Sequence, residues 1–366
     1  MASLTTAPAP AGGSRYFLGV DVGGTKSHAL IADETGQAVG FAEAGPGNHE
    51  VVGYPGLTAA LKQATSAALA MVGIGCEQVA GAGFGVAGYD WPSERAPTLA
   101  AVETLGLQAP LEVVNDTIIG LLAGAEAGWG VAVVAGTGAN CWGWDRQRNT
   151  GRVMGNGYLF GENGGAGELV ITAIQQVVKD WTRRGPGTAL TAALVEFAGA
   201  SSCADLLEGL SQGVYTVGAE AAPLVFSVAE SGDAVASEVI RWAGRELGSL
   251  ATGVIRQLGF ERLEFELVLV GSMFNDGPLL LEPMQEVVGA VAPGARYVRL
   301  TAPPVAGAVL LAMERAGLAP GPRRPRLMAS TMDLLNWQGV AQAETPSAPP
   351  GSPWQNIDRI GRNLEP

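Results

Sequence analysis

The chain has 366 residues, of which 47% are apolar and 16% charged, and its formal net charge is −13. This length is enough for two packed domains. So acidic a composition argues against nucleic acid as a partner, because binding its phosphates needs Lys and Arg. The apolar runs are short and interrupted, so we expect no membrane-spanning segment. Three widely spaced cysteines indicate neither a disulfide framework nor a zinc site and favour a cytoplasmic protein.

The first half of the chain predicts strands and helices in alternation. Residues 1–14 have neither the basic start nor the apolar stretch of a secretory signal, so we expect a flexible leader. Three strands should then form a β-meander, followed by alternating helices and buried strands. The expected elements are strands over 16–21, 28–32 and 37–42, a helix over 57–72, strands over 79–86 and 111–114, and a helix from 117. This order is typical of an α/β domain.

The second half repeats this order. Its expected elements are strands over 130–135 and 140–144, helices over 167–181 and 235–258, and a strand over 267–270. Residues 317–366 are rich in Pro, a composition that buries little surface, so we expect a poorly packed tail. Its few apolar residues, such as Leu334, Leu335 and Trp337, are candidates for docking on the body or on a partner.

Two segments, Leu18–Ser27 and Val131–Cys141, share one plan of an apolar strand, a tight Gly-Thr turn and a second strand. Such a turn points consecutive backbone N–H groups into one concavity, which binds anions such as phosphate. Gly also supplies the positive φ of ordinary hairpin turns, so two hairpins are the alternative interpretation. The pair of turns, with Asp21 at the end of the first strand, favours nucleotide binding.

Two acids are candidates for the chemistry. Asp21 precedes the first turn, where a carboxylate either caps the turn or holds a hydrated Mg²⁺ that bridges phosphate oxygens. Asp116 lies between an apolar strand and a helix, where it is either an N-cap or a base for a substrate hydroxyl. Lys26, in the first turn, is either a solvated strand residue or a phosphate ligand.

Three polar clusters are candidates for ligand contacts. Gly155–Glu168 is dense in Gly, which lets a ligand approach the backbone, and its Glu162 can accept hydrogen bonds from sugar hydroxyls. A flexible loop is the alternative interpretation. The shorter clusters Gly47–His49 and Gly88–Asp90 each follow a predicted strand.

One motif is misleading. Gly83–Gly88 fits the Gly-x-Gly-x-x-Gly pattern of dinucleotide-binding folds. In those folds the helix starts inside the glycines, whereas here the next helix is predicted only from about Pro92. The two histidines, His28 and His49, are too few and too separated to predict a metal site or a serine triad.

Together these motifs resemble the N-acetylglucosamine kinase-like branch of the BadF/BadG/BcrA/BcrD ATPase family, within the actin, heat-shock chaperone and sugar-kinase superfamily. The resemblance covers about Tyr16 to Ala316. The matching segments are Gly19–Thr25 and Gly136–Cys141 as the two phosphate loops, Val114–Asp116 and Ala302–Leu310 as the two connecting segments, and Val270–Ser272 as the adenosine motif.

The resemblance implies an α/β fold of two ribonuclease-H-like (actin-like ATPase) domains, with ATP and sugar in an interdomain cleft. The expected domains are 15–119, completed by a helix at about 305–316, and 120–304. Asp116 would be the base for the sugar 6-hydroxyl, and Asp21 the acid on the Mg²⁺ side. The implied nucleotide contacts are Gly23, Gly24, Thr25, Lys26, Gly136, Thr137, Gly138, Asn140, Gly271 and Ser272. The implied sugar contacts are Asn48, Gly88, Asp116, Asn156, Gly157 and Glu162.

The chain departs from the family where the sugar loop often reads Gly-Trp-Gly, because it has Gly155-Asn156-Gly157 instead. The choice among N-acetylglucosamine, glucosamine and another hexose therefore stays open. The zinc-binding cysteines of the related ROK sugar kinases are absent. Two alternatives are an ATPase of the dehydratase-activator type, which needs cysteines for an iron–sulfur cluster, and a non-catalytic sugar-binding protein. The expected cofactors are ATP and Mg²⁺, and a homodimer is left open.

Overall fold

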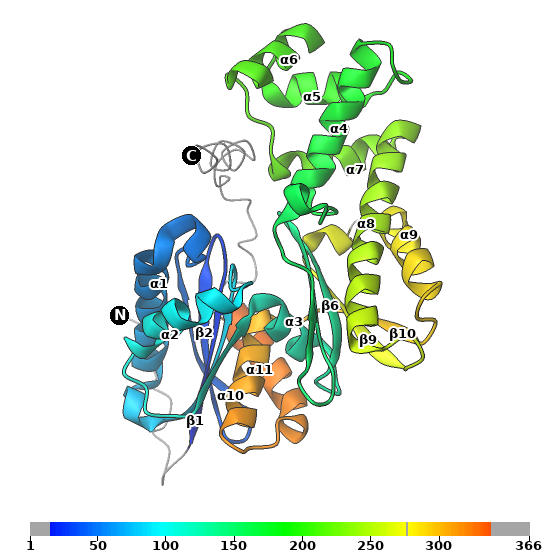
Figure 1. Cartoon of the computed structure of the whole chain (residues 1–366). Coiled ribbons are helices and arrows are strands. Elements are labelled where there is room, and N and C mark those ends of the chain that lie inside the picture. The colour runs from blue at the N-terminus through cyan, green and yellow to red at the C-terminus, as the bar shows by residue number, and fades with distance from the viewer. Residues whose placement is uncertain (1–14, 276, 338–366) are drawn as a thin grey trace, which may run out of the picture. The chain divides into compact units, whose positions relative to one another are not determined.

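The computed structural model describes residues 15–275 and 277–337. They form two α/β units, one of residues 15–123 and 302–337 and the other of residues 124–301 (Figure 1). The predicted division after residue 119 falls inside helix α3 (Asp116–Gly124), so the first segment ends at residue 123 instead. The predicted leader, the end of the predicted tail and the side chain of Trp337 lie outside the described residues.

The first unit is built on a five-stranded sheet of order β3-β2-β1-β4-β5. The first three strands are antiparallel and form the predicted meander, whereas β4 and β5 run parallel to β1. The strands are β1 (Tyr16–Val22), β2 (Ser27–Asp33), β3 (Ala38–Ala44), β4 (Val79–Val86) and β5 (Leu111–Asn115). The helices are α1 (His49–Val72), α2 (Arg95–Glu103), α3, α10 (Pro304–Arg315) and α11 (Arg324–Trp337), with short 3₁₀ turns η1 (Cys76–Gln78), η2 (Pro92–Glu94) and η6 (Gly321–Arg323).

Helix α10 packs directly on the first sheet because two strands present glycines to it. A Cβ atom on Gly19 would lie 2.6 Å from Val309 N, and one on Gly83 would lie 2.2 Å from Ala308 O. No side chain fits at such distances in a close-packed interior. The backbones of β1 and β4 therefore pack closely against α10, and both strands lead into candidate site segments.

The prediction of a poorly packed tail is wrong for residues 321–337, because η6 and α11 pack on the first unit (Figure 1). Leu327 is fully buried and Leu335 nearly so, in one apolar cluster with Phe17. The buried Ser330 hydroxyl accepts a hydrogen bond from Ala38 N at 2.9 Å. A few apolar side chains on one helix face are enough to anchor a segment whose Pro and Arg content suggested otherwise.

Leu327→Ala is expected to lower the free energy of unfolding by about 2–5 kcal/mol, because it leaves a cavity in the core. Urea or thermal unfolding measures the change. Asp333→Ala, on the exposed side of the same helix, is the control and should change stability by less than about 0.5 kcal/mol. Equally small effects of both substitutions would mean that α11 contributes little to the fold.

The second unit repeats the plan of an antiparallel hairpin beside a parallel strand. Its sheet has the order β10-β9-β6-β7-β8, in which β6 and β7 form the hairpin and β9 is parallel to β6. The strands are β6 (Gly130–Ala135), β7 (Ala139–Trp144), β8 (Thr150–Arg152), β9 (Phe265–Val270) and β10 (Ala295–Arg299). The helices are α4 (Ala166–Trp181), α5 (Leu190–Ala198), α6 (Cys203–Gln212), α7 (Ala222–Glu230), α8 (Ala234–Leu258) and α9 (Pro278–Gly289), with 3₁₀ turns η3 (Gly157–Phe160), η4 (Ala219–Ala221) and η5 (Ser272–Asn275).

Within residues 15–275 and 277–337, no single helix has the length and hydropathy of a membrane span. Helices α5 and α6, which are bent relative to each other, have the length and hydropathy of a membrane span only when both are counted together.

Candidate active site

The first Gly-Thr turn joins β1 to β2. Gly23 N donates to Lys26 O at 3.0 Å, which closes the turn. The Gly23 carbonyl accepts from Gly47 N at 3.0 Å and from Asn48 N at 3.3 Å, so the turn is also tied to the segment before α1. Across the part of the chain that the structure describes, the amides of Gly24 and Thr25 have no hydrogen-bond acceptor. They can therefore donate to an anion.

Lys26 has a different partner. Its ammonium lies 3.7 Å from Glu43 Oε2, and its side chain is 43% exposed. This geometry favours the interpretation of Lys26 as a solvated strand residue.

Asp21 and Asp116 lie at the same edge of the first sheet. Asp21 on β1 is in register with Gly85 on β4, which is in register with Val114 on β5, two residues before Asp116. Burial raises the pKa of Asp21 to about 7, with a further contribution from the Asp116 charge, which Lys26 partly offsets. Burial raises the pKa of Asp116 to about 6. Two half-buried carboxyls at one sheet edge, both with a raised pKa, are typical of a functional site.

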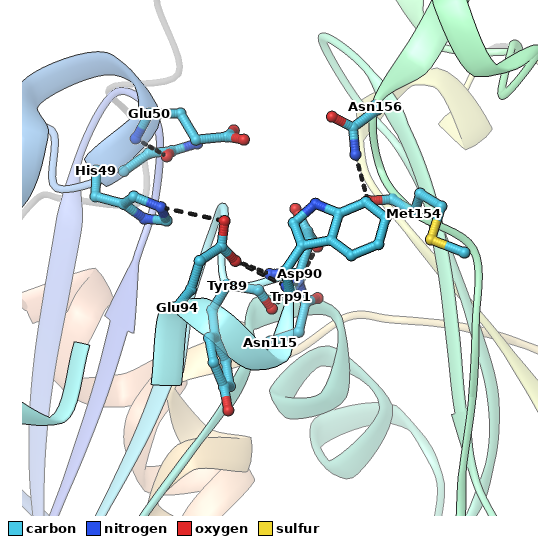
Figure 2. Close-up of polar contacts among 10 residues, drawn as sticks. His49, Glu50, Tyr89, Asp90, Trp91, Glu94, Asn115, Met154 and Asn156 are labelled. Carbon is cyan, nitrogen blue, oxygen red and sulfur yellow. Dashed lines mark hydrogen bonds and ion pairs between the residues drawn. The ribbon is translucent and has the colours of Figure 1, made fainter. Parts of the chain in front are cut away.

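Asn115 fixes the start of the helix that carries Asp116. The Asn115 side chain is buried, and its Oδ1 accepts from Thr117 N at 2.9 Å. Its Nδ2 donates to Asp90 Oδ1 at 2.9 Å (Figure 2). Because Asn115 caps α3, the Asp116 side chain is not needed as the N-cap of this helix.

Asn48 and Gly88, both predicted sugar contacts, lie together in the first unit. Asn48 caps α1, since its Oδ1 accepts from Glu50 N at 2.9 Å. Gly88 has a φ of +78°, and a Cβ there would lie 2.4 Å from Asn48 Oδ1. Only Gly allows this approach. The hydrogen bond from Asn48 N to the first turn places both residues close to that turn.

The second Gly-Thr turn joins β6 to β7 and is held by α4. Gly136 N donates to Gly138 O at 3.0 Å, and Thr137 and Gly138 are exposed. The first amides of α4 donate to this turn, Ala166 N to Gly136 O at 2.9 Å and Gly167 N to Thr137 O at 2.9 Å. These two hydrogen bonds hold the carbonyl groups of the turn against the N-terminus of α4. Nearby, Asn140 Oδ1 accepts from the adjacent Cys141 N.

The predicted adenosine segment lies beside the second turn in the same unit. Val270, the last residue of β9, is in register with Val134 on β6. Gly271 follows with a φ of +108°, and a Cβ there would lie 2.2 Å from Ala135 O. The Arg299 guanidinium donates to Gly271 O at 2.7 Å. Ser272, the next residue, is exposed at the start of η5.

The predicted sugar loop of the second unit is organised by Glu162. This buried carboxylate accepts from Met154 N at 2.5 Å and from Asn156 N at 2.8 Å. Glu162 N in turn donates to Gly157 O at 3.0 Å. The Asn156 side chain donates to Met154 O at 3.0 Å (Figure 2). Both carboxylate oxygens of Glu162 therefore serve the loop itself, which the sequence did not indicate.

A cavity of about 730 Å³ lies elsewhere in the second unit, with a lining from α4, α8 and residues 186–187 that includes Lys179, Trp242 and Arg245. None of the predicted site residues lines it. In the described residues, no group of three or more His, Cys, Asp or Glu side chains is placed to hold a metal ion. A cation at Asp21 would take its other ligands from phosphate and water, as Mg²⁺ commonly does.

The chain belongs to the BadF/BadG/BcrA/BcrD ATPase family, whose model matches residues 18–312. It is 25% identical over 300 residues to an N-acetylmuramic acid/N-acetylglucosamine kinase of Clostridium acetobutylicum, with coverage of 81% of this chain and 98% of the relative. It is 27% identical over 310 residues to the N-acetyl-D-glucosamine kinase of Dictyostelium discoideum, with coverage of 81% and 97%. These matches confirm the family predicted from the motifs.

The fold class is confirmed as well. A crystal structure of a Chromobacterium violaceum protein assigned as an N-acetylglucosamine kinase superimposes with a TM-score of 0.62 at 22% identity and covers 81% of this chain and 98% of that one. At this identity the likeness concerns the fold alone.

Proposed function

We propose that the protein is an ATP-dependent sugar kinase that phosphorylates the 6-hydroxyl of an amino sugar, N-acetylglucosamine or glucosamine. The observation that carries this proposal is the pair of half-buried carboxyls, Asp21 and Asp116, at one sheet edge that also holds a turn with free amides. The names of the two kinase relatives support the same activity. The choice of amino sugar rests on those names and on the sugar loop.

In the proposed reaction each group has one role. Asp116 takes the proton of the sugar 6-hydroxyl. The hydroxyl oxygen then bonds to the γ-phosphorus of ATP, and ADP leaves. The amides of Gly24 and Thr25 and those of the second turn donate to phosphate oxygens. Mg²⁺, when bound, neutralises developing phosphate charge. Asp21 fits a hydrated Mg²⁺, because a cation there relieves the repulsion that helps to raise its pKa.

A coupled ADP-release assay with Mg-ATP tests the proposal. It is run without sugar and then with N-acetylglucosamine, glucosamine, N-acetylmannosamine, N-acetylmuramic acid and glucose. Release that depends on an amino sugar supports the kinase, and the preferred sugar identifies the substrate. Equal release without sugar would instead support the activator-type ATPase, although buried Cys141, whose thiol pKa is raised by burial, is a poor cluster ligand. Sugar binding without turnover would indicate a binding protein.

Activity is expected to fall as pH decreases from 8 to 5. A base must be deprotonated to act, and the pKa of Asp116 is raised to about 6. Saturating Mg-ATP should keep Asp21 ionised, so kcat/KM for the sugar then reports mainly on Asp116. Initial rates across this range, with the coupling enzymes checked at each pH, measure the profile. A flat profile would contradict the assignment of Asp116 as the base.

A further inference from the structure

A polar network in the first unit reaches Asn115 from the start of α1, and its central residue is Glu94 (Figure 2). Glu94 ends η2 with a side chain only 17% exposed. Its Oε2 accepts from two consecutive amides, Asp90 N at 2.8 Å and Trp91 N at 2.8 Å. One carboxylate oxygen therefore fixes the backbone of the loop that follows Gly88.

The other carboxylate oxygen faces α1. His49 Nε2 lies 3.6 Å from Glu94 Oε1, and the His49 side chain is 9% exposed. The imidazole stacks on Tyr54 with ring centroids 4.6 Å apart. Glu94 thus connects the loop to the residue that directly follows Asn48, one of the proposed sugar contacts.

The same loop is joined to the base. The Asp90 carboxylate is buried and accepts from Asn115 Nδ2 at 2.9 Å. Asn115 also accepts from Thr117 N and so orients the first turn of α3. A continuous series of contacts therefore runs from Glu94 through Asp90 and Asn115 to the helix turn that presents Asp116.

We infer that Glu94 is a positioning residue that keeps the proposed sugar-binding loop and Asp116 in one fixed geometry. The inference rests on the proposed function. Buried groups of opposite hydrogen-bonding type are held in place by each other, and the loss of one leaves the rest unsatisfied. Because a small displacement of a reacting group greatly slows a reaction, Glu94 should affect sugar turnover without touching either substrate.

Glu94→Ala is expected to lower kcat/KM for the sugar roughly 10- to 100-fold with little change in KM for ATP. Glu94→Gln keeps an oxygen that accepts from both amides, so it should retain most of the sugar turnover. Glu112→Ala is the matched control, because Glu112 is a similarly buried carboxylate, 14% exposed, that pairs with Arg95 and Arg315 at the other end of β5. The measurements are ADP-release kinetics for both substrates, melting temperatures, and hydrogen exchange of residues 88–91.

A sugar-specific loss in Glu94→Ala, rescued in Glu94→Gln and absent in Glu112→Ala, supports the inference. The inference is overturned if Glu94→Ala has wild-type kinetics. It is also overturned if kcat/KM falls equally for the sugar and for ATP, in proportion to a fall in melting temperature. Hydrogen exchange keeps this test separate from the proposed function. Residues 88–91 should exchange faster in Glu94→Ala than in Glu112→Ala even if the wild-type protein shows no sugar-dependent turnover, and unchanged exchange there rejects the positioning role.

Discussion

Asp116→Asn is expected to abolish sugar-dependent ADP release, with a fall in kcat of about 10²–10⁴-fold or more. The amide has nearly the same shape as the carboxylate but cannot take the proton of the sugar hydroxyl. Asn115 caps α3 independently of Asp116, so the helix should form as before. Steady-state rates measure the loss, and calorimetric titration with Mg-ATP checks that nucleotide binding is kept. A variant that retains a near-normal rate would reject Asp116 as the base.

The same substitution should make the protein more stable, and this serves as its internal control. The pKa of Asp116 is raised to about 6 in the folded protein, from 3.8, so the folded state binds more protons than the unfolded state between those values. Its contribution to stability therefore falls as pH rises through that window. At pH 8, Asp116→Asn should raise the free energy of unfolding by about 1–3 kcal/mol. The difference should shrink as pH approaches 4, and a lower melting temperature of the variant at pH 8 would contradict the raised pKa of Asp116 in the folded protein.

The strands were the most predictable part of the fold. An apolar run such as 79–86 has few alternatives to a buried strand, and β4 occupies those residues. Helix boundaries were less predictable. The helix expected over 57–72 is preceded by a short helical segment that starts at His49, and the two meet at a kink where Gly53 is non-helical, with a φ of +68°, two residues before Pro55. Both residue types normally end a helix, so local preference pointed to a later start.

The candidate site likewise has parts that the local sequence predicts and parts that depend on long-range packing. The two Gly-Thr turns and the position of Asp116 between β5 and α3 were predictable because each depends on neighbours within a few residues. The contact between Asp90 and Asn115 joins residues 25 positions apart, which no local pattern indicates. Glu94 makes one half of a capping box, because its carboxylate accepts from Trp91 N, but Trp91 lacks the side-chain acceptor of the other half, so no local signal in the sequence indicated Glu94. Its contact with His49 still depends on how α1 packs.

Gly165→Ala is expected to raise the KM for ATP roughly 10- to 100-fold and to destabilise the protein by about 1–3 kcal/mol. A Cβ at this position would lie 2.4 Å from the carbonyl carbon of Gly138. That neighbour is backbone of the second turn, so either the turn or the start of α4 must move. Movement would separate Ala166 N and Gly167 N from the carbonyls that they bind, and the turn would lose the geometry that lets its amides donate to phosphate.

Gly253→Ala is the matched control for this prediction. Gly253 lies inside α8, and a Cβ there would meet no atom within 4 Å. Because Ala is the better helix former, this variant should be more stable by about 0.5–1 kcal/mol and should bind ATP normally. Calorimetric titration with ATP and thermal unfolding of both variants separate two roles of the second turn. If Gly165→Ala had a lower melting temperature but an unchanged ATP affinity, we would conclude that α4 packs on the second turn but that this turn does not bind the nucleotide.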